Sequence, residues 1–452
     1  MTALWAPDRR AATVGIVLLV TLTAFERMGV TTAMPRLVAE LHGEELYAWP
    51  FLSFLVASVV ATVLAGQLCD RYGPARVVMA GPALFLVGLL VAGFAPSIPV
   101  LLAGRVLQGL GAGTQTVVST VLIGLVYPER DRPAAFGAVS AAWVLPALIG
   151  PAVSGVVTER IGWRFVFLGL VPLVVVAALL LVPVLRRLPE HDGAPPRQGR
   201  LLAAVGAAAG VAGLSWAAQH PSAVMVALGL ASLAVLYVAQ RSLLPAGTLL
   251  ARRGLPVTIL ARGLLAGAYF SCVAYVPLTL TVVHGFDPLL AGLPLTVGSL
   301  GWASASAWQG RHRDLARPVL LRWGFVFVAA GVATLSLVAP AWGVPWVALP
   351  AMALAGAGMG LGVSSVSVLT LAASTPSDRG FNSSAMWLAD QLGSAVLVGI
   401  GGILVPAAGA GTLNLLMAGV AVVGAVVTGP RVTSPGPGGH RPGSRPPRRS
   451  AG

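Results

Sequence analysis

The sequence is 452 residues long, with 56% hydrophobic residues, only 10% charged residues and a formal net charge of +14. Its apolar residues come in repeated blocks of about 18 to 25, the length of a helix that crosses a bilayer. Strands that cross a membrane would instead give alternating segments of about 10 residues. The composition therefore indicates an all-α polytopic membrane protein and excludes one built from membrane-spanning strands.

Fourteen membrane-spanning helices are predicted along the chain. They cover residues 12–34, 48–66, 77–95, 100–126, 134–157, 165–185, 201–218, 223–240, 257–283, 288–308, 318–338, 345–371, 381–404 and 410–429. The apolar run of the first span is too long for a cleavable signal peptide, and no small-residue cleavage site precedes the second span. We therefore expect the first span to remain in the protein.

The arginines indicate how the chain is oriented, because all 29 basic residues are arginine. If the N-terminus is cytoplasmic, most arginines between spans fall in turns on that side, and the opposite turns hold only Arg36, Arg160 and Arg164. The positive-inside rule then predicts a multi-pass protein of the cell membrane with both termini in the cytoplasm. Positive charge spread over many short turns also argues against a nucleic-acid partner.

No cofactor or metal site is expected. Cys69 and Cys272 suggest neither a disulfide framework nor a metal site, and all six histidines lie outside the predicted spans. The absence of a P-loop pattern argues against an ATP-driven pump. No Ser-His-Asp arrangement is supported within the spans, so an enzyme is the weaker hypothesis. The Pro-, Gly- and Arg-rich residues 431–452 predict a disordered basic tail, to which we assign no function.

A repeat divides the chain. The spacing of Gly66, Asp70 and Pro74 recurs in a later turn at Gly310, Asp314 and Pro318. The pair Asp131-Arg132 recurs as Asp378-Arg379 at nearly the same distance along the chain. These repeats predict two homologous six-helix halves, residues 1–190 and 255–430, joined by residues 191–254 with two additional spans. Duplicated halves of this kind indicate a transporter.

Three motifs resemble those of the major facilitator superfamily. The stretch GQLCDRYG matches the family's loop between helices two and three at Gly66, Leu68, Asp70, Arg71 and Gly73. In the fourth span, RVLQGLGAG resembles a second family motif at Arg105, Gln108, Gly109 and Gly111. The fifth span is similar to the antiporter motif at Gly137, Gly150, Pro151 and Gly155, with Pro146 and Ser154 where glycine is common.

The resemblance covers roughly residues 1–430, and the 6+2+6 helix count resembles the 14-helix drug:proton antiporter branch. It implies that Gly66, Asp70, Arg71 and Gly73, with Asp378 and Arg379, latch the two halves together on the cytoplasmic side in the outward-open state. Gly66 and Gly73 are expected to let two helices pack closely at a short turn. Pro146 and Pro151 predict a kinked helix at the interface between the halves.

Only two of the 15 acidic residues, Glu26 and Asp390, lie within predicted spans. A charge at the bilayer centre costs about 2.5–3.5 kcal/mol on insertion scales, so each needs a reason to be there. Helix geometry places Glu26 about 5 Å and Arg105 about 12 Å to the outer side of the midplane. We expect Glu26 to bind a proton or a cationic substrate, with Arg105 and Gln108 tuning its protonation. The alternative is a static partner for Arg27.

Asp390 is the second candidate for the proton-carrying group. It has an equally strong alternative as a permanently protonated side chain that hydrogen-bonds two helices together. Arg262 lies near the start of its span, and we expect it to extend toward the cytoplasm without a role.

Aromatic side chains are the candidates for lining a central cavity: Phe25, Trp143, Tyr269, Phe270, Tyr275, Trp302 and Trp387. Their alternative is contact with lipid or another helix. Few polar groups lie in the spans, which argues against a sugar or a multiply charged metabolite. The overall prediction is a monomeric transporter that exports hydrophobic small molecules, neutral or cationic, in exchange for protons. The alternatives are a metabolite symporter or facilitator and, less favoured, a non-transporting sensor or scaffold.

Overall fold

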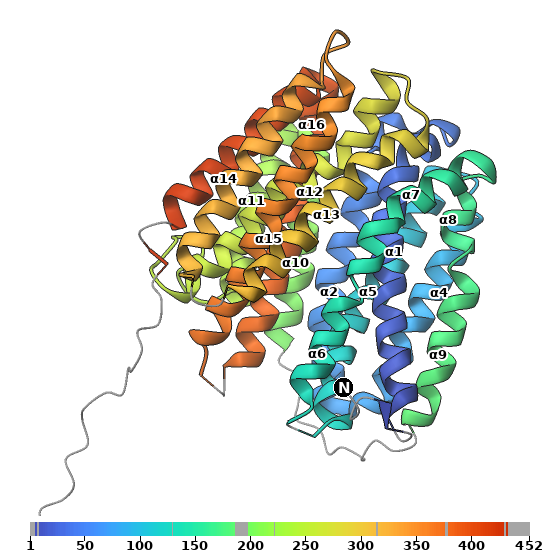
Figure 1. Cartoon of the computed structure of the whole chain (residues 1–452), viewed down its shortest axis with the longest axis vertical. Coiled ribbons are helices and arrows are strands. Elements are labelled where there is room, and N and C mark those ends of the chain that lie inside the picture. The colour runs from blue at the N-terminus through green and yellow to red at the C-terminus, as the bar shows by residue number, and fades with distance from the viewer. Residues whose placement is uncertain are drawn as a thin grey trace, which may run out of the picture.

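The computed structural model describes residues 5–6, 9–128, 130–185, 198–220, 222–312, 315–375, 378–428 and 431–432. Asp314 of the predicted repeat, residues 186–190 of the predicted first half, residues 191–197 of the predicted linker and most of the predicted tail lie outside these residues. Within the described part, the chain is a bundle of helices without strands (Figure 1).

The first group of helices forms one side of the bundle (Figure 1). Its members are α1 (Arg10–Glu40), α2 (Trp49–Tyr72), α3 (Pro74–Val77), α4 (Ala80–Gly93), α5 (Ile98–Val126), α6 (Arg132–Ala141), α7 (Val144–Arg160), α8 (Arg164–Leu168) and α9 (Val171–Leu185). The second group follows α10 (Gln198–Gln219) and α11 (Ala223–Leu243). It consists of α12 (Leu255–Val282), α13 (Pro288–Arg311), α14 (Arg317–Thr334), α15 (Ala348–Ala372) and α16 (Arg379–Thr428).

Thirteen helical stretches of the described chain are long and apolar enough to cross a membrane. The last of them, Gly380–Thr428, contains non-helical backbone at Gly409, where φ is 82° and ψ is 162°. Gly409 lies between the predicted spans 381–404 and 410–429, so this stretch contains both. The prediction of an all-helical, multi-pass membrane fold is confirmed.

The predicted span 134–157 is divided into two helices. The division falls at residues 142–143, between α6 and α7. Pro146 has no N–H to donate to the carbonyl of Ala142, and its ring crowds that carbonyl, so a continuous helix is unfavourable there. The helix is therefore interrupted before Pro146, while Pro151 lies within α7.

The two groups of helices share the same neighbour relations. In the first group α5 packs between α2 and α4, and α1 packs on α7. In the second group α15 packs between α13 and α14, and α12 packs on α16. Contacts between the groups join α7 to α13, α2 to α16 and α1 to α12. The central space between the groups is therefore bordered by helices from both.

Glycine permits the close packing of α5 against α2. A Cβ added to Gly109 would lie 2.3 Å from the carbonyl oxygen of Phe54, and one added to Gly113 would lie 2.4 Å from that of Ser58. Neither carbonyl can move without shifting the backbone of α2, so any larger residue would separate the helices. This packing holds Phe54 and the polar residues of α5 at fixed positions beside the central space.

Candidate functional site

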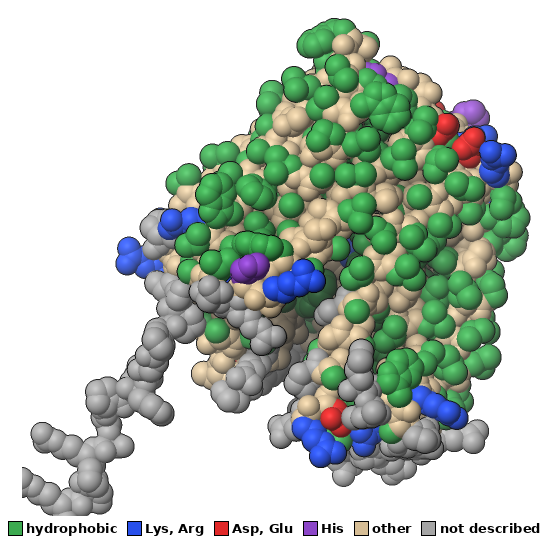
Figure 2. Space-filling model, viewed as in Figure 1, with side chains coloured by type: hydrophobic (Ala, Val, Ile, Leu, Met, Phe, Trp, Pro, Cys, Tyr) green, Lys and Arg blue, Asp and Glu red, His purple; other side chains and the backbone are tan. Residues whose placement is uncertain are grey.

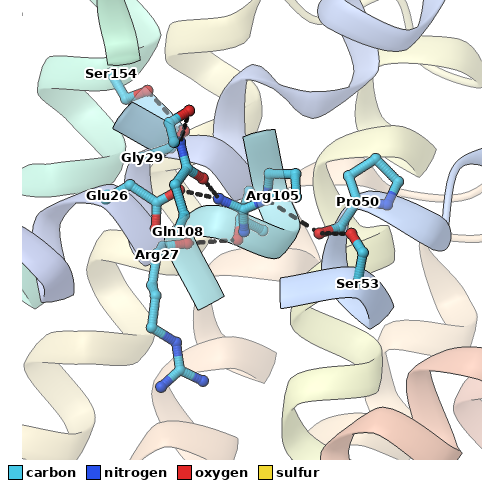
Figure 3. Close-up of polar contacts among 10 residues, drawn as sticks. Glu26, Arg27, Gly29, Pro50, Ser53, Arg105, Gln108 and Ser154 are labelled. Atoms are coloured by element: carbon cyan, nitrogen blue, oxygen red, sulfur yellow. Dashed lines mark hydrogen bonds and ion pairs between the residues drawn. The ribbon is translucent and has the colours of Figure 1, made fainter. Parts of the chain in front are cut away.

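A buried cluster of polar side chains joins α1 to α5. Arg105 donates from Nη1 to Glu26 Oε1 and to Gln108 Oε1, and from Nε to the carbonyl of Pro50 at 3.0 Å (Figure 3). Gln108 donates in turn to the carbonyl of Gly88 at 3.2 Å. The structure therefore brings together Glu26, Arg105 and Gln108, the three residues that the sequence singled out in the first and fourth spans.

Glu26 is fully enclosed. Its side chain is 0% exposed and that of Arg105 is 3% exposed. Among the described residues, Oε2 of Glu26 is buried without a hydrogen-bond partner, whereas Oε1 contacts Arg105. A buried carboxylate oxygen without a partner is unfavourable, and protonation of the carboxyl group removes its charge. The cluster therefore combines a fully buried carboxyl group, one oxygen of which lacks a described hydrogen-bond partner, with a guanidinium held by several acceptors.

A second buried ion pair joins α12 to α16. Arg262 donates from Nε to Asp390 Oδ2 at 2.6 Å, and their side chains are 6% and 4% exposed. The guanidinium of Arg262 also lies 5.4 Å from the centre of the Trp387 ring. The expectation that the Arg262 side chain extends toward the cytoplasm is wrong. Pairing with a nearby buried carboxylate is more favourable for the guanidinium than extending between apolar helices to the membrane surface.

Two cavities lie between the helix groups, and both are bordered by Arg27 and Phe54. The larger, about 280 Å³, extends from these residues past Trp143 and Trp387 toward Phe136. The smaller, about 60 Å³, is bordered also by Arg105 and Phe270. Figure 2 shows the surface hollowed between the two helix groups, at the end of the molecule where Figure 1 marks the N-terminus.

The predicted aromatic residues fall into two sets. Trp143 and Trp387 border the larger cavity, and Phe270 borders the smaller one. Tyr269 and Trp302 pack on Phe270, with ring centres 5.3 Å and 6.3 Å from its own, and border neither cavity. Phe25 and Tyr275 also border neither, and the Tyr275 hydroxyl donates to the carbonyl of Val398 at 3.2 Å.

Sequence reasoning missed Arg27, Phe51 and Phe54 as cavity residues. Arg27 carries a usable signal, because a charged guanidinium in a span needs a partner or water as much as the two acids do. Phe51 and Phe54 carry a weaker signal, because they share one face of α2 with the polar residues Ser58 and Thr62, which also border the larger cavity.

The loop after α2 differs from its expected packing. Gly73 has a φ of 77°, a conformation that favours glycine. The expectation that Gly66 allows close helix packing is wrong, because an added Cβ there would meet no atom within 4 Å. Asp70 and Arg71 are exposed, and Arg71 lies 4.9 Å from the Tyr72 ring centre.

The other two residues of the predicted latch, Asp378 and Arg379, lie in the loop before α16 and at its start. Asp378 accepts a hydrogen bond from the Thr375 hydroxyl at 2.6 Å. Arg379 begins α16, and its side chain lies outside the described set. Within the described part of the chain, the contacts given for Arg71 and Asp378 are local, with Tyr72 and Thr375 respectively.

The helix-five motif lies mainly at the border between the two helix groups. A Cβ on Gly155 would come 2.7 Å from Cα of Leu289 on α13, and one on Gly150 would come 3.3 Å from Cβ of Met28 on α1. Pro146 and Pro151 are buried in the same helix. Gly137 on α6 is different, because no atom lies within 4 Å of its added Cβ. Glycines of α7 therefore allow it to pack closely on α1 and α13 at once.

No group of three or more His, Cys, Asp or Glu side chains with metal-binding geometry occurs in the described part of the chain. We therefore assign no metal ligands.

Residues 16–398 match the family model of the Major Facilitator Superfamily, and the chain belongs to this family. Among its relatives is the Acurin A biosynthesis cluster MFS-type transporter of Aspergillus aculeatus, 34% identical over 44% of this chain and 38% of that protein. Another is Multidrug resistance protein 3 of Bacillus subtilis, 28% identical over 39% of this chain and 35% of that protein. These alignments span less than two fifths of either relative.

Solved structures of the same fold match nearly the whole chain. An auto-inhibited POT family peptide transporter aligns with a TM-score of 0.69 at 14% identity, over 93% of this chain and 96% of its own. A D-xylose-proton symporter aligns with a TM-score of 0.66 at 16% identity, over 94% of this chain and 97% of its own. At this level of identity, the likeness establishes the fold alone.

Proposed function

We propose that this protein is a proton-coupled secondary transporter that exports hydrophobic small molecules by alternating access. Its moving parts are the two six-helix halves, residues 1–190 and 255–430, with residues 191–254 as a linker that holds two additional spans. The observation that carries the proposal is the buried contact of Glu26 with Arg105, since Arg105 also borders the central cavity.

The contact offers a physical link between a proton and the cavity. While Glu26 is ionised, it offsets the positive charge of Arg105. When Glu26 takes up a proton, this compensation is lost, and the guanidinium must find another partner or water. Proton binding at a site closed to solvent would thus change the charge presented at the cavity wall. Asp390 with Arg262 forms a second pair of the same kind and is the second candidate for the proton site.

The arrangement of the cavity supports a conformation open at one end. At the opposite end the Tyr47 hydroxyl donates to the carbonyl of Ala274 at 2.9 Å, and the Tyr47 and Tyr275 rings lie 5.4 Å apart. Close packing of Gly155 against Leu289 adds to this closure. If both termini are cytoplasmic, as the arginine distribution predicts, the cavity is open to the cytoplasm.

The exposed loops fit the same cycle. Asp70 and Arg71 would come into contact with the other half only when the cytoplasmic end closes and the opposite end opens. We propose the same for Asp378 and Arg379. The transporter would work as a monomer in the cell membrane, with protons and a small molecule as its partners.

Everted membrane vesicles with an acidic interior test this function. A panel of lipophilic dyes and drugs is added, and uptake and proton release are recorded together for the wild type, Glu26→Gln and the matched control Glu159→Gln, whose side chain is exposed. Substrate-dependent proton release that is lost in Glu26→Gln but kept in Glu159→Gln is the expected result. Proton release that survives in Glu26→Gln and is lost in Asp390→Asn would transfer the role to Asp390. Uptake without proton movement in the wild type would refute coupling and indicate a facilitator.

A further inference from the structure

Arg27 is set apart from the other charged side chains buried among the helices. Its guanidinium carbon lies 5.8 Å from the ring centres of Phe54 and Trp143 and 5.9 Å from that of Phe270. These rings come from α2, the junction of α6 with α7, and α12, so they belong to both halves. Figure 3 shows the guanidinium turned away from the cluster of Glu26, Arg105 and Gln108.

The two acids buried in the spans are already engaged elsewhere. Glu26 contacts Arg105, and Asp390 contacts Arg262. Among the described residues, the side chain of Arg27 forms no ion pair within 4.0 Å and no hydrogen bond. A charge that is partly removed from water is stabilised by an opposite charge or by hydrogen bonds, and the aromatic faces supply only part of this. Arg27 is therefore a positive charge available to a ligand.

The charged side chains described in the cavity linings are all positive. Among the described residues, Arg27 is the one charged residue that borders the larger cavity, and Arg105 also borders the smaller one. No aspartate or glutamate occurs in either lining within the part of the chain that the structure describes. The remaining walls are apolar, aromatic, hydroxyl or amide groups, such as Trp143, Ser58 and Gln115. A positively charged guest would thus meet guanidinium groups and no carboxylate among the described lining residues, whereas an anion would find a guanidinium.

We propose that Arg27 binds the acidic group of the substrate, and that the central cavity accepts amphipathic organic anions with an aromatic or aliphatic body. This specifies the substrate class within the proposed transport function and replaces the cationic option that the sequence left open. A guanidinium holds a carboxylate or sulfonate through paired hydrogen bonds, and Phe54, Trp143 and Phe270 would enclose the apolar body. This assignment of the substrate's charge does not depend on whether protons move with the substrate or against it.

Three dansyl compounds with one fluorophore and different charge test the proposal. Dansylglycine carries a carboxylate, dansylglycinamide is its neutral counterpart, and dansylamidoethyl-trimethylammonium carries a positive charge. Binding to the purified full chain in nanodiscs is followed by energy transfer from tryptophan, since Trp143 borders the cavity beside Arg27. The acid is expected to bind about tenfold more tightly than the amide, and the ammonium compound more weakly than either.

Variants separate a charge effect from a structural one. Arg27→Gln should reduce the preference for acid over amide to less than about twofold and leave the affinity for the amide unchanged. Arg27→Lys should keep a preference because it keeps the charge, and the exposed control Arg160→Gln should behave as the wild type does.

Three results would overturn the proposal: tighter binding of the ammonium compound, an equal loss of all three ligands in Arg27→Gln, or no binding of dansylglycine by the wild type. Because the assay measures binding without a proton gradient, it can fail or succeed separately from the vesicle experiment. A preference for the acid with no transport in vesicles would keep the binding site and refute the transport function.

Discussion

Replacing Arg262 alone should destabilise the protein far more than replacing Arg262 and Asp390 together. Their contact is 2.6 Å from Nε to Oδ2, and both side chains are almost fully enclosed between α12 and α16. Two unit charges about 4 Å apart attract by about 4 kcal/mol at an effective dielectric constant of about 20. Removing one partner loses this attraction and leaves the other charge buried.

The expected loss for Arg262→Met or Asp390→Leu is about 3–5 kcal/mol in the free energy of unfolding. The double variant should recover most of it, because replacing a buried ion pair by apolar residues of similar volume is often close to neutral. The measurement is unfolding of the purified protein by SDS in mixed micelles, followed by tryptophan fluorescence, for the wild type and the three variants.

Two outcomes would refute this reasoning. Single variants within about 0.5 kcal/mol of the wild type would mean that the pair contributes no more than an exposed one. A double variant with the summed loss of both single variants would mean that the two side chains act independently.

Three other predictions concern packing, backbone and pH. Gly109→Val should lower the melting temperature, at a cost of about 1–3 kcal/mol, because its side chain would meet a carbonyl of α2. Gly66→Ala should change the melting temperature little, because its side chain would lie in open space. Heating followed by size-exclusion chromatography measures the melting temperature of both variants. Gly73→Ala should cost about 1–2 kcal/mol in the same assay because of its φ of 77°, and an unchanged melting temperature would contradict the strain. Burial raises the pKa of Tyr127, against the opposing effects of its hydrogen bond with Thr13 and of nearby positive charge. Its contribution to stability is therefore constant below the unfolded pKa of about 10 and falls as the pH rises above it, so Tyr127→Phe should make the alkaline decline in melting temperature shallower.

Local features of the chain were enough to predict the candidate cluster. Glu26 and Asp390 stand out because acids are rare in spans, and helix rise alone predicted that Glu26 and Arg105 lie within reach of each other. Gly109 belongs to the motif of the fourth span, and the close packing of α5 on α2 explains why glycine occurs at this position. These features depend on composition and on distance along one helix, which neighbouring helices do not alter.

The pairing of Arg262 required the tertiary structure. Its distance from the start of the span suggested a side chain that reaches the membrane surface. Only the packing of α12 on α16 reveals Asp390 as a closer partner, because that packing brings together two residues 128 positions apart. The same reason applies to Gly66, whose motif suggested a close helix contact that this conformation does not contain.

The sequence by itself determined the class of this protein: a membrane protein whose helices are set by apolar runs of bilayer length and interrupted by proline and glycine. The tertiary structure decided which side chains border the cavity, among them Arg27, Phe54 and Trp143 but not Tyr269 or Phe25. The physical reason is that these helices are apolar on nearly every side. In a bilayer, a face turned to lipid and a face turned to protein can both be apolar, so hydrophobicity alone does not determine how each helix is rotated, and packing against neighbours decides it.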